Sequence, residues 1–288
     1  MSEFAGIRSQ VNKKALKKFP HARRRDLDYM RTHLAPREGG RVLEIGAGSG
    51  FFSGHIADML DPTGRLVVSD PSLDQLDIVI ALQRKNIDVI QYVQFGSRCV
   101  DLEREKVDAI WSFGAMHHMQ QKQQSFYNMK RILKPGGRVV VCDVFQGSRL
   151  AKHFDIQVAQ FCETGHEVSF WSREYAESIC ARVELAQPTF VDVDMKWEFD
   201  RKKDIGEFLY LLHAMTGTTK RGCLEGAENI LGVKKVGAKY ILHWPMTVMV
   251  TGWNSIDINI VYLKKISHLS VTDFLVGAEG LEPPTLSV

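Results

Sequence analysis

Short apolar runs recur through the first half of the chain and alternate with stretches of helical periodicity. The apolar runs that we predict as buried strands occupy residues 41–45, 65–70, 88–93, 107–112 and 138–145. Between them, apolar residues recur at the spacing of amphipathic helices, most clearly over 51–60 and 120–133. Strands that alternate with helices in this way predict a parallel sheet whose connections are right-handed crossovers.

The pattern changes after about residue 146. Helical periodicity continues without the regular return of buried strands, and one later strand alternates between apolar and polar residues as a half-exposed strand does. Residues 277–288 contain turn residues and no periodic face, and we predict a tail of uncertain structure over 254–288. The elements predicted in this half are helices over 150–164, 172–183 and 203–216 and strands within 189–199 and 239–253.

Charge is distributed unevenly along a chain of ordinary composition. An apolar fraction of 44% is sufficient for a sizeable core in 288 residues. The first 25 residues hold eight Lys or Arg against one acidic residue, hence a formal charge of +7, which leaves −4 for the rest of a chain whose net charge is +3. This basic N-terminal arm, 1–25, could make peripheral contact with anionic lipid, bind nucleic acid, close over a ligand as a lid, or be solvated and partly disordered.

Several sequence signals are absent. The N-terminal arm lacks the apolar region of a secretory signal, and no apolar run approaches the ~18 residues of a transmembrane segment. The five cysteines are scattered without a CxxC pair, and no HxxxH pattern or carboxylate cluster is present. We therefore expect a cytoplasmic protein in a reducing compartment, with neither disulfides nor a metal site.

The strongest chemical signal is the segment VLEIGAGSGFFSGHIA, residues 42–57. A predicted strand runs into a loop in which Gly46, Gly48 and Gly50 alternate with small residues, and a helix follows. Glycines allow close approach of the backbone to a ligand, and a helix N-terminus adds partial positive charge and free N–H groups. Asp70 ends the next predicted strand, where a carboxylate can accept both hydroxyls of a ribose. This order of features predicts a nucleoside-binding site.

The glycine spacing distinguishes between nucleoside ligands. The dinucleotide fingerprint is GxGxxG, whereas this loop has the spacing GxGxG, with Glu44 two residues before the first glycine. The pattern resembles motif I of the class I S-adenosylmethionine-dependent methyltransferases. The resemblance covers residues 26–145 in order and looks closest to the small-molecule branch that includes quinone-biosynthesis methyltransferases. The further segments that carry it are LDPTGRLVVSD (60–70), VDAIWSFGAMHHM (107–119) and MKRILKPGGRVVVCD (129–143).

The resemblance implies an α/β, Rossmann-like class I methyltransferase fold. Its seven-stranded, mostly parallel sheet would carry helices on both faces, and its last two strands would be 189–199 and 241–252. Residues 200–235 would be inserted between these two strands as a helical cover. The predicted domains are the basic arm 1–25, a methyltransferase domain 26–253 with a donor-binding half 26–145 and an acceptor-binding half 146–253, and the tail 254–288.

The superfamily motifs also assign donor-binding residues. The resemblance implies that Glu44 orients the glycine loop and that Asp70 holds the ribose hydroxyls of S-adenosylmethionine. The chain departs from the family pattern after the third strand, where many relatives carry an Asp-Ala pair that contacts the adenine edge; here either Asp101 or backbone groups take that role. The full set of predicted donor contacts is Glu44, Gly46, Ala47, Gly48, Gly50, Asp70, Pro71, Asp101, Ser112 and Phe113.

Two adjacent histidines, His117 and His118, follow the fourth predicted strand, on the edge of the sheet where ligands bind in this kind of fold. Methyl transfer is an in-line displacement in which the protein mainly aligns the reactants, so a base is needed only when the acceptor loses a proton. Histidine suits that role at neutral pH, which makes His118, and second to it His117, candidate catalytic bases. Both can instead be structural, one bonded to backbone near the next helix and one packed beneath it.

These features predict an enzyme that transfers a methyl group from S-adenosylmethionine to a small hydrophobic or aromatic acceptor at oxygen, carbon or nitrogen. The aromatic residues of 146–216 favour a bulky acceptor. The alternatives are a nucleic-acid or protein methyltransferase that uses the basic arm, and a catalytically decayed protein that keeps the donor site. The acidic body and the lack of an amino-methylation motif disfavour nucleic acid as a substrate. The sequence specifies neither the acceptor nor the oligomeric state.

Overall fold

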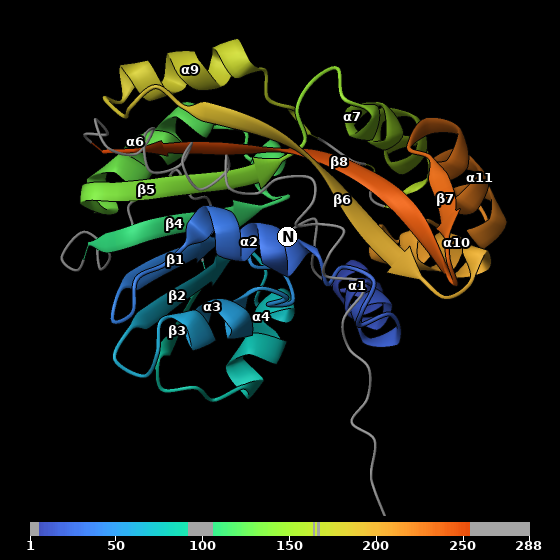
Figure 1. Cartoon of the computed structure of the whole chain (residues 1–288), viewed down its shortest axis with the longest axis horizontal. Coiled ribbons are helices and arrows are strands. Elements are labelled where there is room, and N and C mark those ends of the chain that lie inside the picture. Colours follow the sequence, from blue (N-terminus) through green and yellow to red (C-terminus); the bar gives the residue numbers. More distant parts are fainter. Residues whose placement is uncertain (1–5, 92–105, 164, 166–167, 254–288) are drawn as a thin grey trace, which may run out of the picture. The chain divides into compact units, whose positions relative to one another are not determined.

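One open sheet organises the part of the chain that the structure describes, which in this computed structural model is residues 6–91, 106–163, 165 and 168–253. Its strands are β1 (Arg41–Ile45), β2 (Arg65–Asp70), β3 (Ile87–Gln91), β4 (Val107–Phe113), β5 (Leu133–Asp143), β6 (Thr189–Phe199), β7 (Val233–Val236) and β8 (Lys239–Gly252). They lie in the order β3-β2-β1-β4-β5-β8-β6, and β7 pairs with β8 (Figure 1). The first five strands run parallel, whereas β8 runs antiparallel to β5, β6 and β7.

The predicted mostly parallel sheet is confirmed, with one addition. Every residue of β1 after Arg41 and of β2 after Arg65 is buried, which explains why these strands have continuous apolar sequences. Among the described residues the sheet has eight strands, because β7 adds to the expected seven. Exposed Lys234 and Lys235 fill the middle of β7, so its sequence lacks the apolar pattern of a strand.

Helices cover both faces of this sheet. The bounds are α1 (Ile7–Lys18), α2 (Asp26–Leu34), α3 (Ser53–Met59), α4 (Leu73–Ala81), α6 (Lys122–Ile132), α7 (Arg149–His153), α8 (Ala159–Phe161), α9 (Arg173–Arg182), α10 (Lys202–Leu212) and α11 (Lys220–Ile230). The strand order reverses between β1 and β4. Right-handed crossovers therefore place α3 and α4 on one face and α6 on the other, where α9 packs beside α6 (Figure 1). The main core lies on this second face and includes Leu43, Ile110, Phe126 and Trp171.

The segment after β5 is less regular than predicted. In place of one helix over 150–164, α7 runs into a π-helical turn, η2 (Phe154–Val158), and then into the short α8. The wider winding of a π turn accompanies the burial of two adjacent side chains, His153 and Phe154. Both of their rings lie 5.9 Å from the ring of Trp244.

An insertion between β6 and β8 holds α10, α11 and β7, which confirms the predicted helical cover over 200–235. The side chain of Thr219 begins α11 by accepting a hydrogen bond from the Gly222 N–H at 3.0 Å. Gly206 of α10 allows the two helices to pack closely, because a Cβ there would lie 2.1 Å from the Lys220 carbonyl oxygen.

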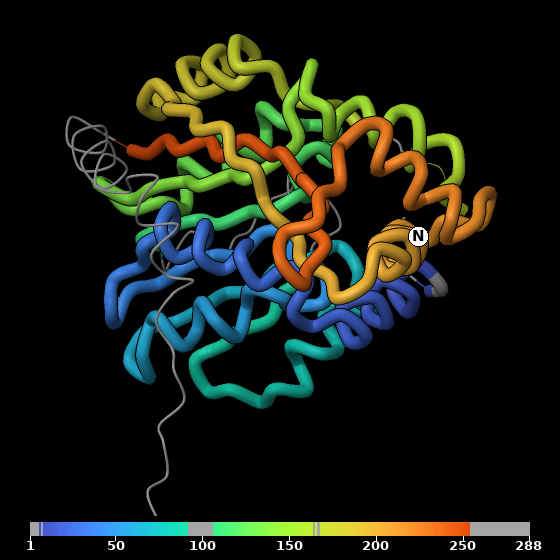
Figure 2. The backbone as a smooth tube through the Cα atoms, turned by 45° about the vertical axis from the view of Figure 1, so that its right-hand side comes forward, coloured from blue at the N-terminus to red at the C-terminus, as the bar shows by residue number. Residues whose placement is uncertain are grey.

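Part of the basic N-terminal arm is a helix, α1, that lies along α10 (Figure 2). The Asn12 side chain donates a hydrogen bond to the Leu212 carbonyl at 3.2 Å, and Lys18 pairs with Glu207 at 2.7 Å. On its other side Lys13 pairs with Asp77 of α4 at 2.5 Å. The expectation of a solvated, partly disordered arm is therefore wrong for these residues, because α1 contacts both α4 of the first half and α10 of the insertion.

Two further sequence predictions concern residues that lie outside the described ranges. Residues 92 and 93 of the predicted third strand, and the whole tail 254–288, lie outside the described ranges. Within those ranges, no helix has the length and apolar character needed to cross a membrane.

Candidate active site

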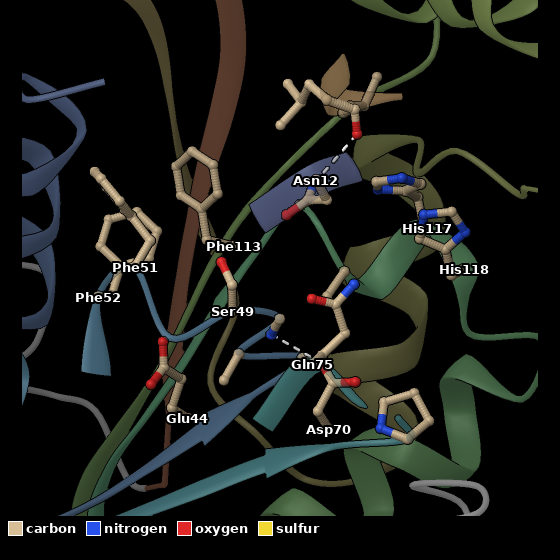
Figure 3. A pocket seen from close by; sticks show the side chains of 18 of the residues that line it. Asn12, Glu44, Ser49, Phe51, Phe52, Asp70, Gln75, Phe113, His117 and His118 are labelled. Atoms are coloured by element: carbon tan, nitrogen blue, oxygen red, sulfur yellow. Dashed lines mark hydrogen bonds between the residues drawn. The ribbon is translucent and has the colours of Figure 1, made fainter. Parts of the chain in front are cut away.

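The carboxyl ends of β1, β2 and β4 open into a cavity of about 500 Å³. This is the point at which the strand order reverses, where ligands bind in doubly wound folds. Its wall combines the glycine loop and the ends of these strands with side chains from α1, the 3₁₀ turn after β4, β6, β8 and the end of α10. Figure 3 shows Phe51, Phe52 and Phe113 on one side of the cavity and His117 and His118 on the other, with Asn12 of α1 between them.

The glycine loop is tied to β2 through its backbone. The N–H groups of Gly46 and Ala47 both donate to the Ser69 carbonyl, at 2.8 and 3.1 Å. Gly46 has a φ of +68°, and a Cβ there would lie 2.3 Å from the Cβ of Ala115. Gly48, with a φ of +54°, faces open space, so it is the glycine at which a ligand can approach the backbone.

Asp70 lies buried at the end of β2, directly beside the glycine loop. The Gly48 N–H donates to its Oδ2 at 2.9 Å, and the Ser72 N–H donates to its Oδ1 at 2.9 Å. Burial raises the pKa of Asp70, and the two backbone hydrogen bonds oppose this. Each carboxylate oxygen retains a second lone pair, so Asp70 can still accept two hydroxyl groups.

Glu44 is buried in β1 on the same side of the cavity. The Ser53 hydroxyl donates to its Oε2 at 2.5 Å. Burial raises the pKa of Glu44 to about 8; the negative charge of Asp70 also raises it, and the Ser53 hydrogen bond opposes them. The side chain is therefore mostly uncharged at pH 7.

The residues after β4 have different positions relative to the cavity. Phe113 lines it, whereas Ser112 is buried beneath it and donates from Oγ to the Ile45 carbonyl at 3.1 Å. Ser112 thus fastens β4 to the end of β1. Ala47 and Pro71 also line the cavity, and Asp101 lies outside the described residues.

His117 and His118 belong to a short 3₁₀ turn, η1 (Met116–His118), and both line the cavity. Their ring centroids are 4.2 Å apart. Nδ1 of His117 lies 2.5 Å from Oδ1 of Asp143, and the His117 backbone N–H donates to Oδ2 at 3.0 Å. A carboxylate at Nδ1 favours the tautomer with the proton on that atom, which leaves Nε2 as the nitrogen that can accept a proton.

Asp143 did not emerge from the sequence patterns, although a signal for it existed. It is the last residue of β5, fully buried, and it receives a further hydrogen bond from the Val144 N–H at 2.7 Å. Like Asp70, it is an acid at the carboxyl end of a parallel strand, where side chains reach the crevice. The same rule therefore identifies both carboxylates.

The part of the cavity wall formed by β6, β8 and the residues after β5 and α10 is aromatic. Trp197 of β6 and Trp244 of β8 stack with centroids 4.1 Å apart, and His213 stacks on Trp244 at 5.9 Å. Phe154 meets Trp244 edge to face. The sequence predicts an acceptor wall from the aromatic residues of 146–216; the structure adds residues of α1 and β8, because those elements also line the cavity.

Comparisons with known proteins agree with this geometry. A family model described as a methyltransferase domain matches residues 43–141. The chain is similar to curated proteins named ubiquinone/menaquinone biosynthesis C-methyltransferase UbiE: it is 28% identical over 109 residues to the one from Francisella tularensis subsp. novicida (37% of this chain, 44% of the relative). For the one from Pseudomonas entomophila, identity is 27% over 173 residues, covering 57% of this chain and 67% of the relative. The match to the Francisella protein thus spans less than half of that relative's length.

A similar fold occurs in the crystal structure of the YcgJ protein from Bacillus subtilis. The TM-score is 0.55 at 15% sequence identity, and the superposition covers 81% of this chain and all of that one. Residues 43–141 thus match a methyltransferase domain, the curated relatives are named as methyltransferases, and the likeness to the solved structure shows the shared fold.

Proposed function

We propose that the protein transfers a methyl group from S-adenosylmethionine to a small hydrophobic or aromatic acceptor that loses a proton in the reaction. The observation that carries this proposal is one cavity whose wall includes the glycine loop, Asp70, His117 and the aromatic side chains of β6 and β8. Donor-type and acceptor-type features thus face the same cavity, which a group transfer between two bound molecules requires.

The donor end suits S-adenosylmethionine, which supplies an electrophilic methyl group when bound. The open space at Gly48 admits a ligand against the backbone, and Asp70 has lone pairs left for two ribose hydroxyls. The mostly uncharged Glu44 can donate or accept a hydrogen bond there without adding a second negative charge. Phe113 lines the cavity beside Phe52 of the loop after the glycines, with ring centroids 4.9 Å apart.

His117 is the base that the geometry favours. Its Nδ1 is held by the buried Asp143, so Nε2 takes the proton that the acceptor loses, and the Asp143 carboxylate stabilises the resulting imidazolium. His118 remains the alternative base, since it lines the same cavity. An acceptor oxygen or activated carbon requires such a base, so both are preferred to an amine.

The basic arm gives little support to a nucleic-acid substrate. Three of its cations form ion pairs with acids of the same chain: Lys13 with Asp77, Lys18 with Glu207 and Arg25 with Glu198. Phosphate binding depends on cations that are available to displace counterions. We therefore place a small molecule ahead of nucleic acid as the acceptor.

The test begins with calorimetry of S-adenosylhomocysteine binding. We expect the wild type to bind it and Asp70→Ala to bind about 10- to 100-fold more weakly, because hydrogen bonds to a charged group are lost. The exposed carboxylate of Asp88 on β3 provides the control, and Asp88→Ala should bind as the wild type does. A wild type that binds neither this nucleoside nor S-adenosylmethionine at about 100 μM, which corresponds to roughly −5.5 kcal/mol, contradicts the proposal.

Turnover is then measured with a methyl-labelled donor and a panel of phenols, aromatic acids and enolisable ketones. Transfer of label to one of them supports the proposed function. Tight nucleoside binding without transfer to any member of the panel indicates instead a protein that keeps the donor site and has lost catalysis.

A further inference from the structure

Arg23 presents a guanidinium group to the cavity in an unusual setting. Its Nε donates to Oδ2 of Asp26 at 2.8 Å, and Asp26 is fully buried. The other oxygen of Asp26 accepts a hydrogen bond from Trp197 Nε1 at 3.0 Å. The carboxylate thus holds Arg23 by its inner edge, and the two terminal nitrogens have no hydrogen-bond partner among the described residues.

Aromatic rings hold the guanidinium in place. Its Cζ lies 4.6 Å from the ring centroid of Phe51 and 5.1 Å from that of Phe113, both on the donor side. It lies 5.4 Å from the centroid of Trp197, on the aromatic wall. The side chain is only 11% exposed, so these contacts fix a cation that is largely removed from water.

The acidic side chains around the cavity lie at the glycine loop, and the Arg23 guanidinium lies at the aromatic wall. The charged side chains among the described residues that line the cavity are Arg8, Arg23, Glu44 and Asp70. The two acids lie at the glycine loop, and one of them, Glu44, is mostly uncharged at pH 7. The carboxylate of Asp26 is turned away behind Arg23 and is shared with Trp197. The aromatic wall therefore lies beside the positively charged guanidinium of the Arg23–Asp26 ion pair. Among the described residues that line the cavity, no acidic side chain lies at this wall.

We propose that Arg23 binds an anionic oxygen group of the acceptor, so that the acceptor is a flat, apolar acid or ionised hydroxy compound and not an amine. This inference rests on the proposed function and narrows its substrate class. The planar guanidinium offers two parallel N–H donors, which match a carboxylate or a pair of ionised oxygens, while the rings beside it cover a flat apolar body. A protonated amine would meet a desolvated cation of the same sign.

The experiment uses three probes that share a 4-hydroxyphenyl body: 4-hydroxycinnamate, which is anionic, 4-hydroxycinnamamide, which is neutral, and tyramine, which is cationic. Binding to the full-length protein is measured by calorimetry with and without saturating S-adenosylhomocysteine. For the wild type we expect the acid to bind at least about 10-fold more tightly than the amide, as one charge-assisted bidentate contact provides, and tyramine to bind most weakly.

The variants separate recognition from packing. Arg23→Met should abolish the preference for the acid over the amide. Arg23→Lys should restore part of that preference, because lysine carries the positive charge but lacks the planar guanidinium with its two parallel N–H donors. Arg23→Met combined with Asp26→Asn should behave as Arg23→Met does while leaving no unpaired buried carboxylate. The matched control is Arg24→Met, which removes the neighbouring, exposed cation and should keep the wild-type preference.

Three results would overturn the inference: equal binding of acid and amide by the wild type, an acid preference that survives in the Arg23→Met and Asp26→Asn double variant, or no binding of the acid up to about 5 mM, roughly −3 kcal/mol. Loss of S-adenosylhomocysteine binding is a separate result, because it contradicts the proposed function. Titrations of the probes without the nucleoside keep the two failures distinguishable.

Discussion

At the scale of single residues, two buried carboxyl groups, Glu44 and Asp70, lie at the glycine-loop end of the cavity, and burial changes the protonation of Glu44. Ionising Glu44 beside Asp70 in a buried site is unfavourable, which raises the pKa of Glu44 to about 8. An uncharged Glu44 leaves the negative charge of Asp70 as the main charge near the glycine loop. The folded chain therefore holds a proton on Glu44 at a pH where the unfolded chain does not.

This linkage gives a prediction with a definite sign. A carboxyl whose pKa is raised on folding contributes stability that is fully present below its unfolded value, 4.5, and is lost as the pH rises toward 8. Glu44→Gln resembles the protonated form at every pH. Between pH 6 and 7.5 we expect the wild type to lose about 2 kcal/mol of unfolding free energy relative to Glu44→Gln. Urea unfolding of both proteins at both pH values measures this loss. A difference in unfolding free energy between the two proteins that does not change with pH would contradict the raised pKa of Glu44.

The paired histidines give a second prediction at the same scale. If His117 is the base, His117→Gln should lower kcat by about 10²- to 10⁴-fold, the usual range for a positioned base. Binding of S-adenosylhomocysteine should stay within about threefold, because the proposed donor contacts are made by the glycine loop and Asp70 and not by the 3₁₀ turn that holds His117. His118→Gln is the matched control and should retain most of the activity. The opposite ranking of the two variants, measured with the acceptor found in the screen, would transfer the role to His118.

At the scale of elements, the N-terminal helix α1 supplies a wall that the sheet cannot provide. Its Asn12 and Leu16 line the cavity, and contacts of Lys13 to α4 and of Asn12 to α10 hold the middle of the helix. After the helix, the ring of Phe19 packs edge to face on Phe208, at a centroid distance of 5.8 Å. Exposed ion pairs such as Lys13 with Asp77 contribute little, so the aromatic contact is the stronger attachment.

Removing that attachment should loosen α1 before it unfolds the domain. For Phe19→Ala we expect a loss of about 2 kcal/mol, below the range for a fully buried phenylalanine because Phe19 is only partly buried. Amide hydrogen exchange should accelerate over residues 7–18 while β1 and β4 keep their protection. Lys17→Ala, at an exposed position of the same helix, serves as the control. Unchanged exchange in α1 would mean that other contacts hold it.

At the scale of the whole molecule, the parts that could be predicted are those specified by local sequence. The central strands were predictable because both of their faces are buried, and the helical insertion because its apolar face has a helical period. The packing of α1 could not be, because its contact to Leu212 joins residues 200 positions apart. The exposed strand β7 exists only through pairing with β8, so its own residues do not indicate it.

The candidate site divides in the same way. Gly46, Asp70 and Phe113 sit at motif positions next to strand ends, and all three line the cavity. Ser112 occupies such a position too, yet its hydroxyl fastens two strands. Arg23 is a different case, because its role depends on rings from the glycine loop, β4 and β6 that converge only in the folded chain. Local motifs therefore indicated residues at the glycine-loop end of the cavity, and tertiary packing determines its aromatic end.

The stability of the whole molecule in acid should reflect its buried histidines. Burial lowers the pKa of both His33 and His153 to about 4, and neither ring nitrogen of His153 has a hydrogen-bond partner in the described part of the chain. A histidine whose pKa falls on folding contributes stability that is full above its unfolded value, 6.5, and is lost as the pH falls toward 4. Between pH 7 and 5, His153 alone should therefore cost the wild type about 2 kcal/mol.

The test compares urea unfolding of the wild type with that of His153→Phe, which keeps an aromatic ring against Trp244 and cannot be protonated. The advantage of the variant should grow by about 2 kcal/mol as the pH falls from 7 to 5. His55→Gln, at an exposed position of α3, should show no such growth. If His153→Phe and the wild type lose stability in parallel on acidification, then the folded protein accommodates a protonated His153, and the acid sensitivity must come from other groups such as His33.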